Sequence, residues 1–193
     1  MGRDTLKVMG ASNHCDEERS KLDYYGTDPK STKALLEVEK FDDFIWEPAA
    51  GHHLIANVLK DAGYEVMTTD IADYGFGDEQ IDFLNLEGEE FHEGDIITNP
   101  PYGISTEFAV KALQCVKPGH KVAMFLRTLF LEGCKRYEKL FKENPPKVIY
   151  VFMNRQVSDK NDDFNKGSAV SYSWFVWEKG WKGEPTIRWI STK

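Results

Sequence analysis

The sequence predicts an α/β protein whose mostly parallel sheet is covered by helices on both faces. Short apolar runs alternate with amphipathic segments after residue 22, and no internal repeat or low-complexity tract interrupts them. Alternating strands and helices are joined by right-handed crossovers, which make the strands parallel. With 193 residues, 41% hydrophobic and 13% aromatic, the chain can bury one sizeable core. We therefore expect a loose polar arm over residues 1–22 and a single domain over residues 23–193.

The individual elements follow in order from these patterns. A first helix is expected in 27–41, with Asp28 as its cap, proline in its first turn, and Ala34, Leu35 and Val38 at helical spacing. The other predicted helices are 53–63, 105–116 and 132–144. The predicted strands are 44–46, 64–69, 95–98, 121–126, 147–153 and 172–178, with a weak one at 81–84.

Several protein classes are disfavoured by composition. No apolar run approaches the roughly 20 residues that cross a bilayer, and the N-terminus lacks the apolar centre of a signal peptide, so we expect a soluble cytoplasmic protein without a membrane partner. Cys15, Cys115 and Cys134 are an odd number at wide spacings, which favours reduced thiols. His52 and His53 are adjacent and have no third ligand at suitable spacing, so no metal is expected.

The charge is unevenly distributed along the chain. Residues 1–110 contain 8 Lys and Arg against 24 Asp and Glu, whereas residues 111–193 contain 16 against 8, which reproduces the net charge of −8. A chain polarised in this way can present one basic face to nucleic acid despite its acidic total. An ordinary solvated surface with an acidic first half is an equally good interpretation of the charge alone.

A nucleoside pocket is predicted at the carboxyl ends of the strands, where ligands of parallel sheets bind. The stretch "WEPAAGHH" follows the first strand and opens a helix, and Asp70 closes the next strand 19 residues after Gly51. That spacing suits a carboxylate that binds ribose hydroxyls. The sequence has neither the glycine triplet of dinucleotide sites nor a lysine-bearing phosphate loop, so a nucleoside with a small uncharged or zwitterionic tail fits better than a pyrophosphate.

The stretch "NPPY", residues 99–102, follows the fourth strand. The prolines restrict the backbone, so Asn99 and Tyr102 are displayed with little freedom. The Asn99 carbonyl and a proline carbonyl can accept the two hydrogens of one amino group, and Tyr102 offers a ring for stacking. The complementary ligand is an NH2 group on a planar heterocycle or amide.

Methylation is the reaction that these features favour. Asparagine is a poor general base, so Asn99 would orient the amine instead of deprotonating it. Attack by that nitrogen requires a reactive electrophile, and the adenosine pocket suggests S-adenosylmethionine. Catalysis would then depend mainly on proximity and alignment.

The order of "DYYGTDP", "EPAAG" and "NPPY" resembles the S-adenosylmethionine-dependent amino methyltransferases, and among them the N6-adenine-specific DNA methyltransferases. The resemblance covers about residues 23–178, and compact phage or prophage proteins of this kind end similarly to "SYSWFVWEKG". It implies a Rossmann-like class I methyltransferase fold, with a seven-stranded sheet whose last strand, 172–178, is antiparallel.

The resemblance also implies roles for individual residues. Tyr25 and Thr27 would lie near the methionine of the cofactor, Asp70 would bind the ribose, and the target base would be held by Asn99, Pro100, Pro101 and Tyr102 after leaving its stack. Further cofactor contacts are implied for Glu47, Pro48, Ala49, Gly51, Ile71, Asp82, Phe83 and Asn99, of which Asp82 and Phe83 would hold the adenine.

Two departures from the family affect substrate binding. The aromatic residue that usually clamps the flipped base is replaced near its expected place by Val157, with Phe164 further on as the candidate. The chain also leaves no room for a separate target-recognition region. Specificity is therefore expected to be modest, to come from the 154–170 loop, or to come from a partner chain or oligomer.

Basic residues at the rim are further candidates. Arg127 and Arg155 follow the fifth and sixth strands and are expected to meet phosphates, although solvated or capping roles are equally consistent with their positions. A basic helix surface is formed by Lys135, Arg136, Lys139 and Lys142. Trp174 and Trp177 are three apart on one strand and should point to opposite faces of the sheet.

The prediction is thus a methyltransferase acting on adenine N6 in DNA. RNA adenine and protein glutamine side chains stay open as substrates of the same chemistry. A non-catalytic module that binds nucleic acid or protein stays open as a function of another class.

Overall fold

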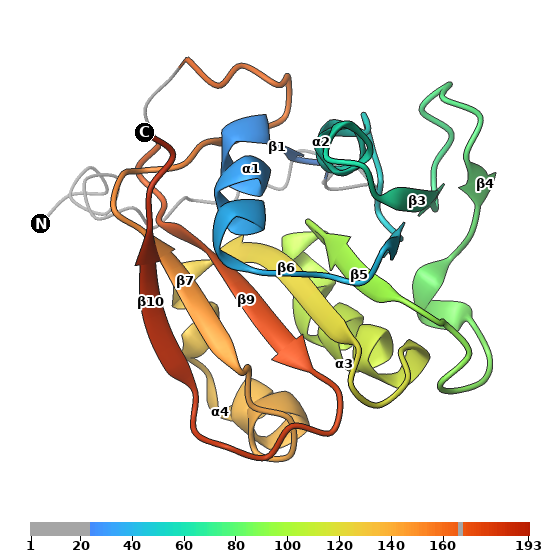
Figure 1. The fold of residues 1–193 in the computed structure, drawn as a ribbon, viewed down its shortest axis with the longest axis vertical. Coiled ribbons are helices and arrows are strands. Elements are labelled where there is room, and N and C mark those ends of the chain that lie inside the picture. The colour runs from blue at the N-terminus through green and yellow to red at the C-terminus, as the bar shows by residue number, and fades with distance from the viewer. Residues whose placement is uncertain (1–23, 166–167) are drawn as a thin grey trace, which may run out of the picture.

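The computed structural model describes residues 24–165 and 168–193, so the predicted arm over 1–22 lies outside the described residues. A twisted sheet of eight strands has helices on both faces (Figure 1). In spatial order the strands are β10 (Thr186–Ile190), β7 (Val148–Phe152), β9 (Tyr172–Glu178), β6 (Lys121–Arg127), β5 (Asp95–Thr98), β2 (Phe44–Glu47), β3 (Glu65–Asp70) and β4 (Glu79–Gln80).

The predicted fold class is confirmed, since every neighbouring pair that excludes β9 is parallel. As expected, β9 is antiparallel to both of its neighbours, β6 and β7. The predicted count of seven strands is wrong, because β10 adds an eighth at the edge. Four of its five residues are exposed, so an apolar pattern could not reveal it.

The weak strand predicted at 81–84 is displaced along the chain. Pairing with β3 occurs at Glu79–Gln80, whereas a 3₁₀ turn, η1, occupies Phe83–Asn85. The side chain of Asp82 accepts a hydrogen bond from the backbone N–H of Leu84, which favours this turn over a strand.

Two helices lie on each side of the sheet (Figure 1). On one face are α1 (Pro29–Val38), capped as predicted by Asp28, and α2 (Leu54–Asp61). The other face is covered by α3 (Ser105–Cys115) and by the short α4 (Cys134–Arg136), which continues into the π-helical turn η4 (Tyr137–Phe141). Further 3₁₀ turns are η2 (Tyr102–Ile104) and η3 (Thr128–Leu131).

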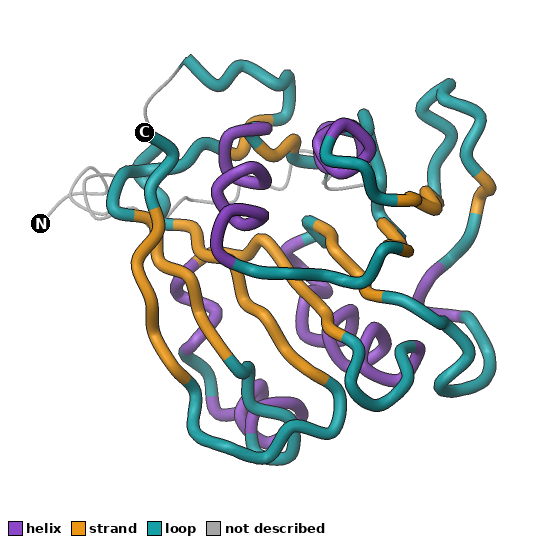
Figure 2. The backbone as a smooth tube through the Cα atoms, in the orientation of Figure 1, coloured by secondary structure: helices purple, strands orange, loops and turns teal. Residues whose placement is uncertain are grey.

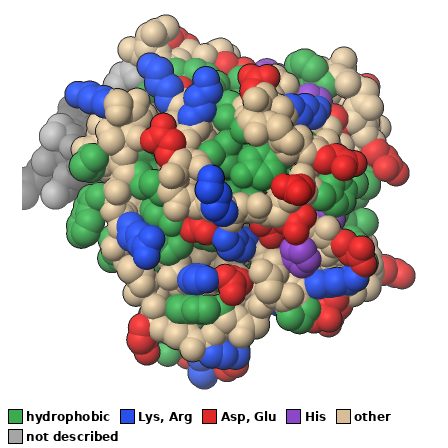
Figure 3. All heavy atoms as spheres, in the orientation of Figure 1, with side chains coloured by type: hydrophobic (Ala, Val, Ile, Leu, Met, Phe, Trp, Pro, Cys, Tyr) green, Lys and Arg blue, Asp and Glu red, His purple; other side chains and the backbone are tan. Residues whose placement is uncertain are grey.

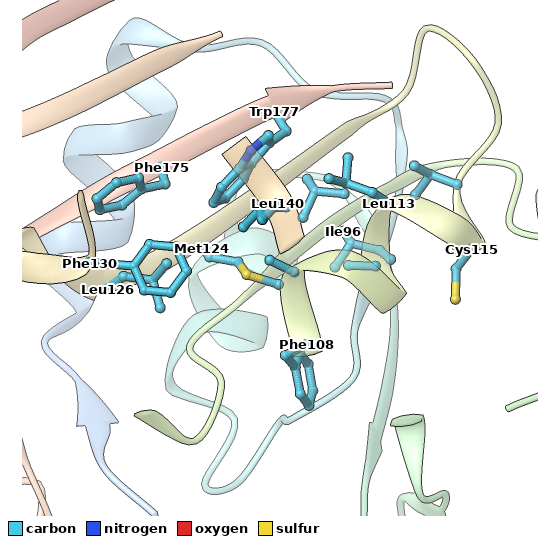
Figure 4. Packing of buried hydrophobic residues seen from close by; sticks show 14 of the residues in the cluster. Ile96, Phe108, Leu113, Cys115, Met124, Leu126, Phe130, Leu140, Phe175 and Trp177 are labelled. Atoms are coloured by element: carbon cyan, nitrogen blue, oxygen red, sulfur yellow. The ribbon is translucent and has the colours of Figure 1, made fainter. Parts of the chain in front are cut away.

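The core consists of two apolar layers separated by the sheet. Alternate residues of each central strand point to opposite faces. Thus Met124 packs under α3, as Figure 4 shows for that layer, whereas Phe125 packs under α1 and α2. Trp174 and Trp177 are both fully buried, in opposite layers, as predicted.

A second, small sheet was not predicted. Strand β1 (Gly26–Thr27) pairs antiparallel with β8 (Ser158–Asp159), which joins the segment before α1 to the loop after β7. Figure 2 shows these loops gathered at one end of the large sheet. Among the helices of the described residues, none is long and apolar enough to cross a bilayer.

Candidate active site

A cleft lies beyond the carboxyl ends of β2, β3 and β5. Its walls come from the loops that follow these strands, from the segment 81–84 after β4, from the first residues of α2 and from the chain segment 24–27. Of the sequence candidates, the cleft is lined by Tyr25, Thr27, Glu47, Pro48, Ala49, Asp70, Ile71, Asp82, Phe83, Asn99, Pro100 and Pro101. The wall thus brings together residues that are widely separated in the chain.

The turn after β2 is held against β3. The backbone N–H of Ala50 donates to the Thr69 carbonyl at 3.1 Å, and that of Gly51 donates to the Asp70 carboxylate at 3.0 Å. Gly51 itself is not part of the cleft wall. Its φ of +50° and the Tyr24 ring, which lies 2.4 Å from where a β-carbon would be, together require glycine.

The side chain of Glu47 points an unsatisfied oxygen into this region. The residue is 2% exposed, and its Oε2 atom has no hydrogen-bond partner in the described part of the chain. Burial raises the pKa of this carboxyl well above its ordinary value, and the nearby charges of Asp70 and Asp78 raise it further. A ligand in the cleft could therefore donate a hydrogen bond to Glu47 Oε2.

The cleft also has an apolar wall. Ile71 is 56% exposed although it lines the cleft, so a flat apolar group bound there would cover it. Phe83 is buried and stacks against Trp46 and Phe108, which fixes the η1 turn in place. The Asp70 carboxylate is oriented by the N–H groups of Gly51 and Ala72.

Asn99 is fixed by two hydrogen bonds from its amide nitrogen. The Nδ2 atom donates to the Tyr25 carbonyl at 2.6 Å and to the Thr27 hydroxyl at 2.9 Å. A carbonyl can only accept, so the NH2 group must face Tyr25 and the Oδ1 atom must face away. Oδ1 is buried and has no hydrogen-bond partner among residues 24–165 and 168–193, which leaves one preformed acceptor in the cleft wall.

Tyr102 lies beside the cleft and not in its wall. Its hydroxyl is 2.9 Å from the Ser158 hydroxyl, and its ring centroid is 5.5 Å from that of Tyr25. The Arg127 guanidinium lies 4.9 Å from the same ring. Burial raises the pKa of the Tyr102 hydroxyl, which therefore stays neutral. A base can stack on Tyr102 only if one of these neighbours moves.

The remaining substrate candidates lie outside the cleft. Arg127 lines a neighbouring hollow with Ser105 and Arg136, and its Nε atom is buried without a partner. Arg155 is exposed and reaches the Ala169 carbonyl at 3.5 Å. Phe164 is half-buried and is absent from the cleft wall.

The paired histidines hold loops through separate aspartates. The Nδ1 atom of His52 is 2.7 Å from Asp162, and the Nε2 atom of His53 is 2.5 Å from Asp78. Within the described part of the chain, no three His, Cys, Asp or Glu side chains are grouped so as to hold a metal ion.

Sequence reasoning missed several members of the cleft wall, notably Tyr24 and Tyr74. Tyr24 packs against His52 with ring centroids 4.3 Å apart, and Tyr74 lies on the other side of the same pair. The aromatic pair "YY" at 24–25 was a usable signal, because Tyr24 directly precedes a predicted cofactor contact.

No protein-family model matches the sequence, and none of the curated proteins matches it significantly. Solved structures do match the fold. One is a predicted O-methyltransferase from Agrobacterium tumefaciens, with 13% identity, 85% of each chain covered and a TM-score of 0.58. Another, from Listeria monocytogenes, is described as a class I S-adenosylmethionine-dependent methyltransferase, with 14% identity, 95% of this chain and 69% of that chain covered, and a TM-score of 0.58.

A third match is a protein from Vibrio vulnificus that is described as a modification subunit of a type I restriction enzyme. It shows 11% identity over 97% of this chain and has a TM-score of 0.64. The chain spans about half the length of the restriction-modification subunits that it matches, with 50%, 44% and 47% of three such chains covered. At these identities the similarity shows a shared fold: the chain has the Rossmann-like fold of class I methyltransferases.

Proposed function

We propose that this protein transfers a methyl group from S-adenosylmethionine to an exocyclic amino group, with adenine N6 in DNA as its substrate. The observation that carries the proposal is the Asn99 Oδ1 atom, a buried acceptor without a partner at the end of β5. A buried acceptor without a donor costs about 1–3 kcal/mol, and an amino group would remove that cost. The cleft that holds it is also lined by Asp70 and Ile71, a carboxylate and an apolar side chain that suit the ribose and the base of a nucleoside cofactor.

The residues of the cleft fit the cofactor by two observations. Glu47 presents a second unpartnered oxygen, which suits the hydroxyl or ammonium donors of S-adenosylmethionine, and exposed Ile71 suits its adenine ring. In this proposal Asp70 binds the ribose. The other contacts are Tyr25, Pro48 and Ala49, with Gly51 shaping the turn and Asp82 and Phe83 beside the adenine.

The chemistry then requires little beyond alignment. The bound cofactor supplies a methyl group already activated by its sulfonium. Asn99 Oδ1 and the Pro100 carbonyl accept the two amino hydrogens and so aim the nitrogen lone pair at that methyl. No base is needed before attack, because the nitrogen becomes acidic only after it is methylated; the proton that it then loses passes to solvent water.

Several observations support DNA as the substrate. Three of the similar structures are modification or methyltransferase subunits of type I restriction systems, and a partner chain or a second copy is proposed to contribute to sequence recognition. Arg127, which lies next to Tyr102, is proposed to meet a phosphate of the extruded nucleotide, and Arg155 and Phe164 are proposed to contact it from the 154–170 loop. Methylation of genomic or phage DNA places the protein in the cytoplasm.

The substrate is tested by incubating the protein with labelled S-adenosylmethionine and, separately, duplex DNA, single-stranded DNA, RNA and protein extract. Nucleoside analysis should find N6-methyladenine in DNA. Label confined to RNA or to glutamine side chains would contradict the proposed substrate. Cofactor binding without transfer to any of them would indicate a non-catalytic module.

The role of Asn99 is tested by Asn99→Ala. This change should abolish transfer while leaving cofactor affinity nearly unchanged, because the lost contact is to the amine. Asn57→Ala is the matched control, since Asn57 is exposed on α2. An equal loss of transfer and of cofactor binding would show that Asn99 serves the cofactor instead.

A further inference from the structure

The small β1–β8 sheet contacts the side chains of Asn99 and Tyr102, the two residues of the "NPPY" motif that are proposed to hold the target base. Gly26 pairs with Asp159 and Thr27 pairs with Ser158, so two segments far apart in the chain form one unit beside the cleft. One strand of this unit contacts Asn99 and the other contacts Tyr102. Each strand of this sheet has only two residues. Its role in the protein must therefore come from the side chains that it positions, Asn99 and Tyr102.

Strand β1 determines the direction of the Asn99 amide. Thr27 is 2% exposed, and its hydroxyl accepts one Asn99 hydrogen while the Tyr25 carbonyl accepts the other. Without these acceptors the amide could rotate and present its NH2 group to an incoming amino group, which has no acceptor to offer. The two bonds therefore keep Oδ1 facing the cleft.

Strand β8 holds the other residue of the motif. The Ser158 hydroxyl bonds to the Tyr102 hydroxyl, and the Tyr102 ring packs against Tyr25, Tyr172 and Arg127. An oxygen on β8 thus helps to fix the far end of the ring that the proposed base would meet.

The unit is itself fastened to the turn after β2. Asp162 accepts a hydrogen bond from the Tyr24 hydroxyl at 2.8 Å and pairs with His52 at 2.7 Å. Gly26 fits under this contact, since a β-carbon there would lie 1.9 Å from the Asp162 carboxylate. Through Asp162, these contacts hold the small sheet against the turn after β2.

We propose that Thr27 and Ser158 are positioning residues: through the β1–β8 sheet they set the orientation of Asn99 and Tyr102 for the target amine. This inference rests on the proposed function. It also gives Thr27 a role different from the cofactor contact that the family resemblance implies, and the two roles are separable by experiment.

The first test compares Thr27→Val with Thr27→Ser. Valine keeps the shape but removes the hydroxyl, so kcat should fall at least about tenfold, since misaligned reacting groups lose rate steeply. The Kd for S-adenosylmethionine should change less than about twofold. Serine, which keeps the hydroxyl, should restore most of the rate, and Thr186→Val on the exposed β10 strand is the control for the substitution itself. Weakened cofactor binding with kcat unchanged would overturn the inference.

A second test does not depend on activity. In ¹⁵N-labelled protein, the Asn99 side-chain hydrogens should exchange with solvent more slowly than those of exposed Asn57. In Thr27→Val the exchange at Asn99 should become about fivefold faster, as expected for the loss of one hydrogen bond. Unchanged exchange would overturn the inference even if methyl transfer is found. Faster exchange in a protein that methylates nothing would uphold the geometry and remove only the proposed function.

The third test examines whether the two strands act together. Ser158→Ala should lower kcat by several-fold, and the double variant with Thr27→Val should lose less than the product of the two separate losses, because both act through one sheet. Independent, fully multiplicative losses would overturn the proposal that the sheet is the common element.

Discussion

At the scale of single residues, two oxygen atoms of the cleft wall have no hydrogen-bond partner within the described residues. Asn99 Oδ1 and Glu47 Oε2 are both buried and both belong to residues of the cleft wall. Buried acceptors in native proteins are nearly always paired, so two exceptions in one cleft point to a ligand that brings its own donors. The energetic cost of these atoms is largest when the cleft is empty.

Glu47→Gln should stabilise the ligand-free protein above about pH 4.5. Burial raises the pKa of Glu47 in the folded state, so its carboxyl favours folding only while protonated. That contribution is complete below the unfolded pKa of about 4.3 and is lost as the pH rises through the raised folded value. Gln stays neutral, so the gain should be near zero at pH 4, grow as the pH rises and be fully developed once the folded pKa is passed.

Thermal unfolding of ligand-free protein between pH 4 and pH 8 measures this gain, and about 1 kcal/mol corresponds to roughly 2–4 °C for a chain of this size. Glu37→Gln on the exposed side of α1 is the control and should shift the midpoint little at any pH. A stabilisation that is equal at pH 4 and pH 8 would mean that the ionisation of Glu47 is not its source.

At the scale of elements, the strands that end in the site were predictable and the elements that cover it were not. Central strands such as 95–98 and 121–127 are buried on both faces. Strands in such positions consist of nearly continuous apolar residues, which can be recognised in the sequence. Strands β1 and β8 have two residues each, and β10 is exposed, so no local pattern marks them. Their pairing is decided by contacts between distant segments.

The same distinction explains the predicted site residues. Those directly after a strand, such as Asp70 and Asn99, lie in the cleft wall because parallel strands end at one edge. Phe164 and Arg155 belong to the long loop after β7, and a loop path cannot be derived from periodicity. The hydrogen-bond partners of Asn99 could not be predicted from local sequence patterns either, since Thr27 precedes Asn99 by 72 residues.

Gly26→Ala should loosen the β1–β8 sheet. The new β-carbon would lie 1.9 Å from the Asp162 carboxylate and 2.8 Å from the Leu54 side chain, so the Asp162 carboxylate must leave the place where it bonds to Tyr24 and His52. We expect faster proteolysis within the 154–170 loop and at least fivefold weaker cofactor binding, since Tyr24 and Tyr25 line the cleft. Gly103→Ala is the control, because no atom lies within 4 Å of its β-carbon position. Unchanged proteolysis and affinity would show that the sheet does not restrain the loop.

At the scale of the whole molecule, the sign of the surface charge changes from one edge of the large sheet to the other. On the face drawn in Figure 3, acidic side chains are more frequent on the side of β3 and β4, and basic ones are more frequent over the middle and the side of β7 and β10. The acidic N-terminal half thus builds the cofactor side of the sheet. The "NPPY" motif follows β5, which lies between β6 and β2 in the strand order and so between the acidic and the basic parts of the chain.

This arrangement predicts that DNA binding weakens steeply with salt although the net charge is −8. If three phosphates are contacted, affinity should fall about 40-fold between 50 and 200 mM salt, because bound counterions are released from the DNA. Arg127→Gln should reduce the slope of log K against log salt by about 1, since Arg127 lies next to Tyr102 with a free Nε–H. Lys33→Gln, on the exposed side of α1, should leave the slope unchanged. Fluorescence anisotropy with a labelled duplex measures the slope, and a salt-independent affinity would contradict phosphate contact as the source of binding.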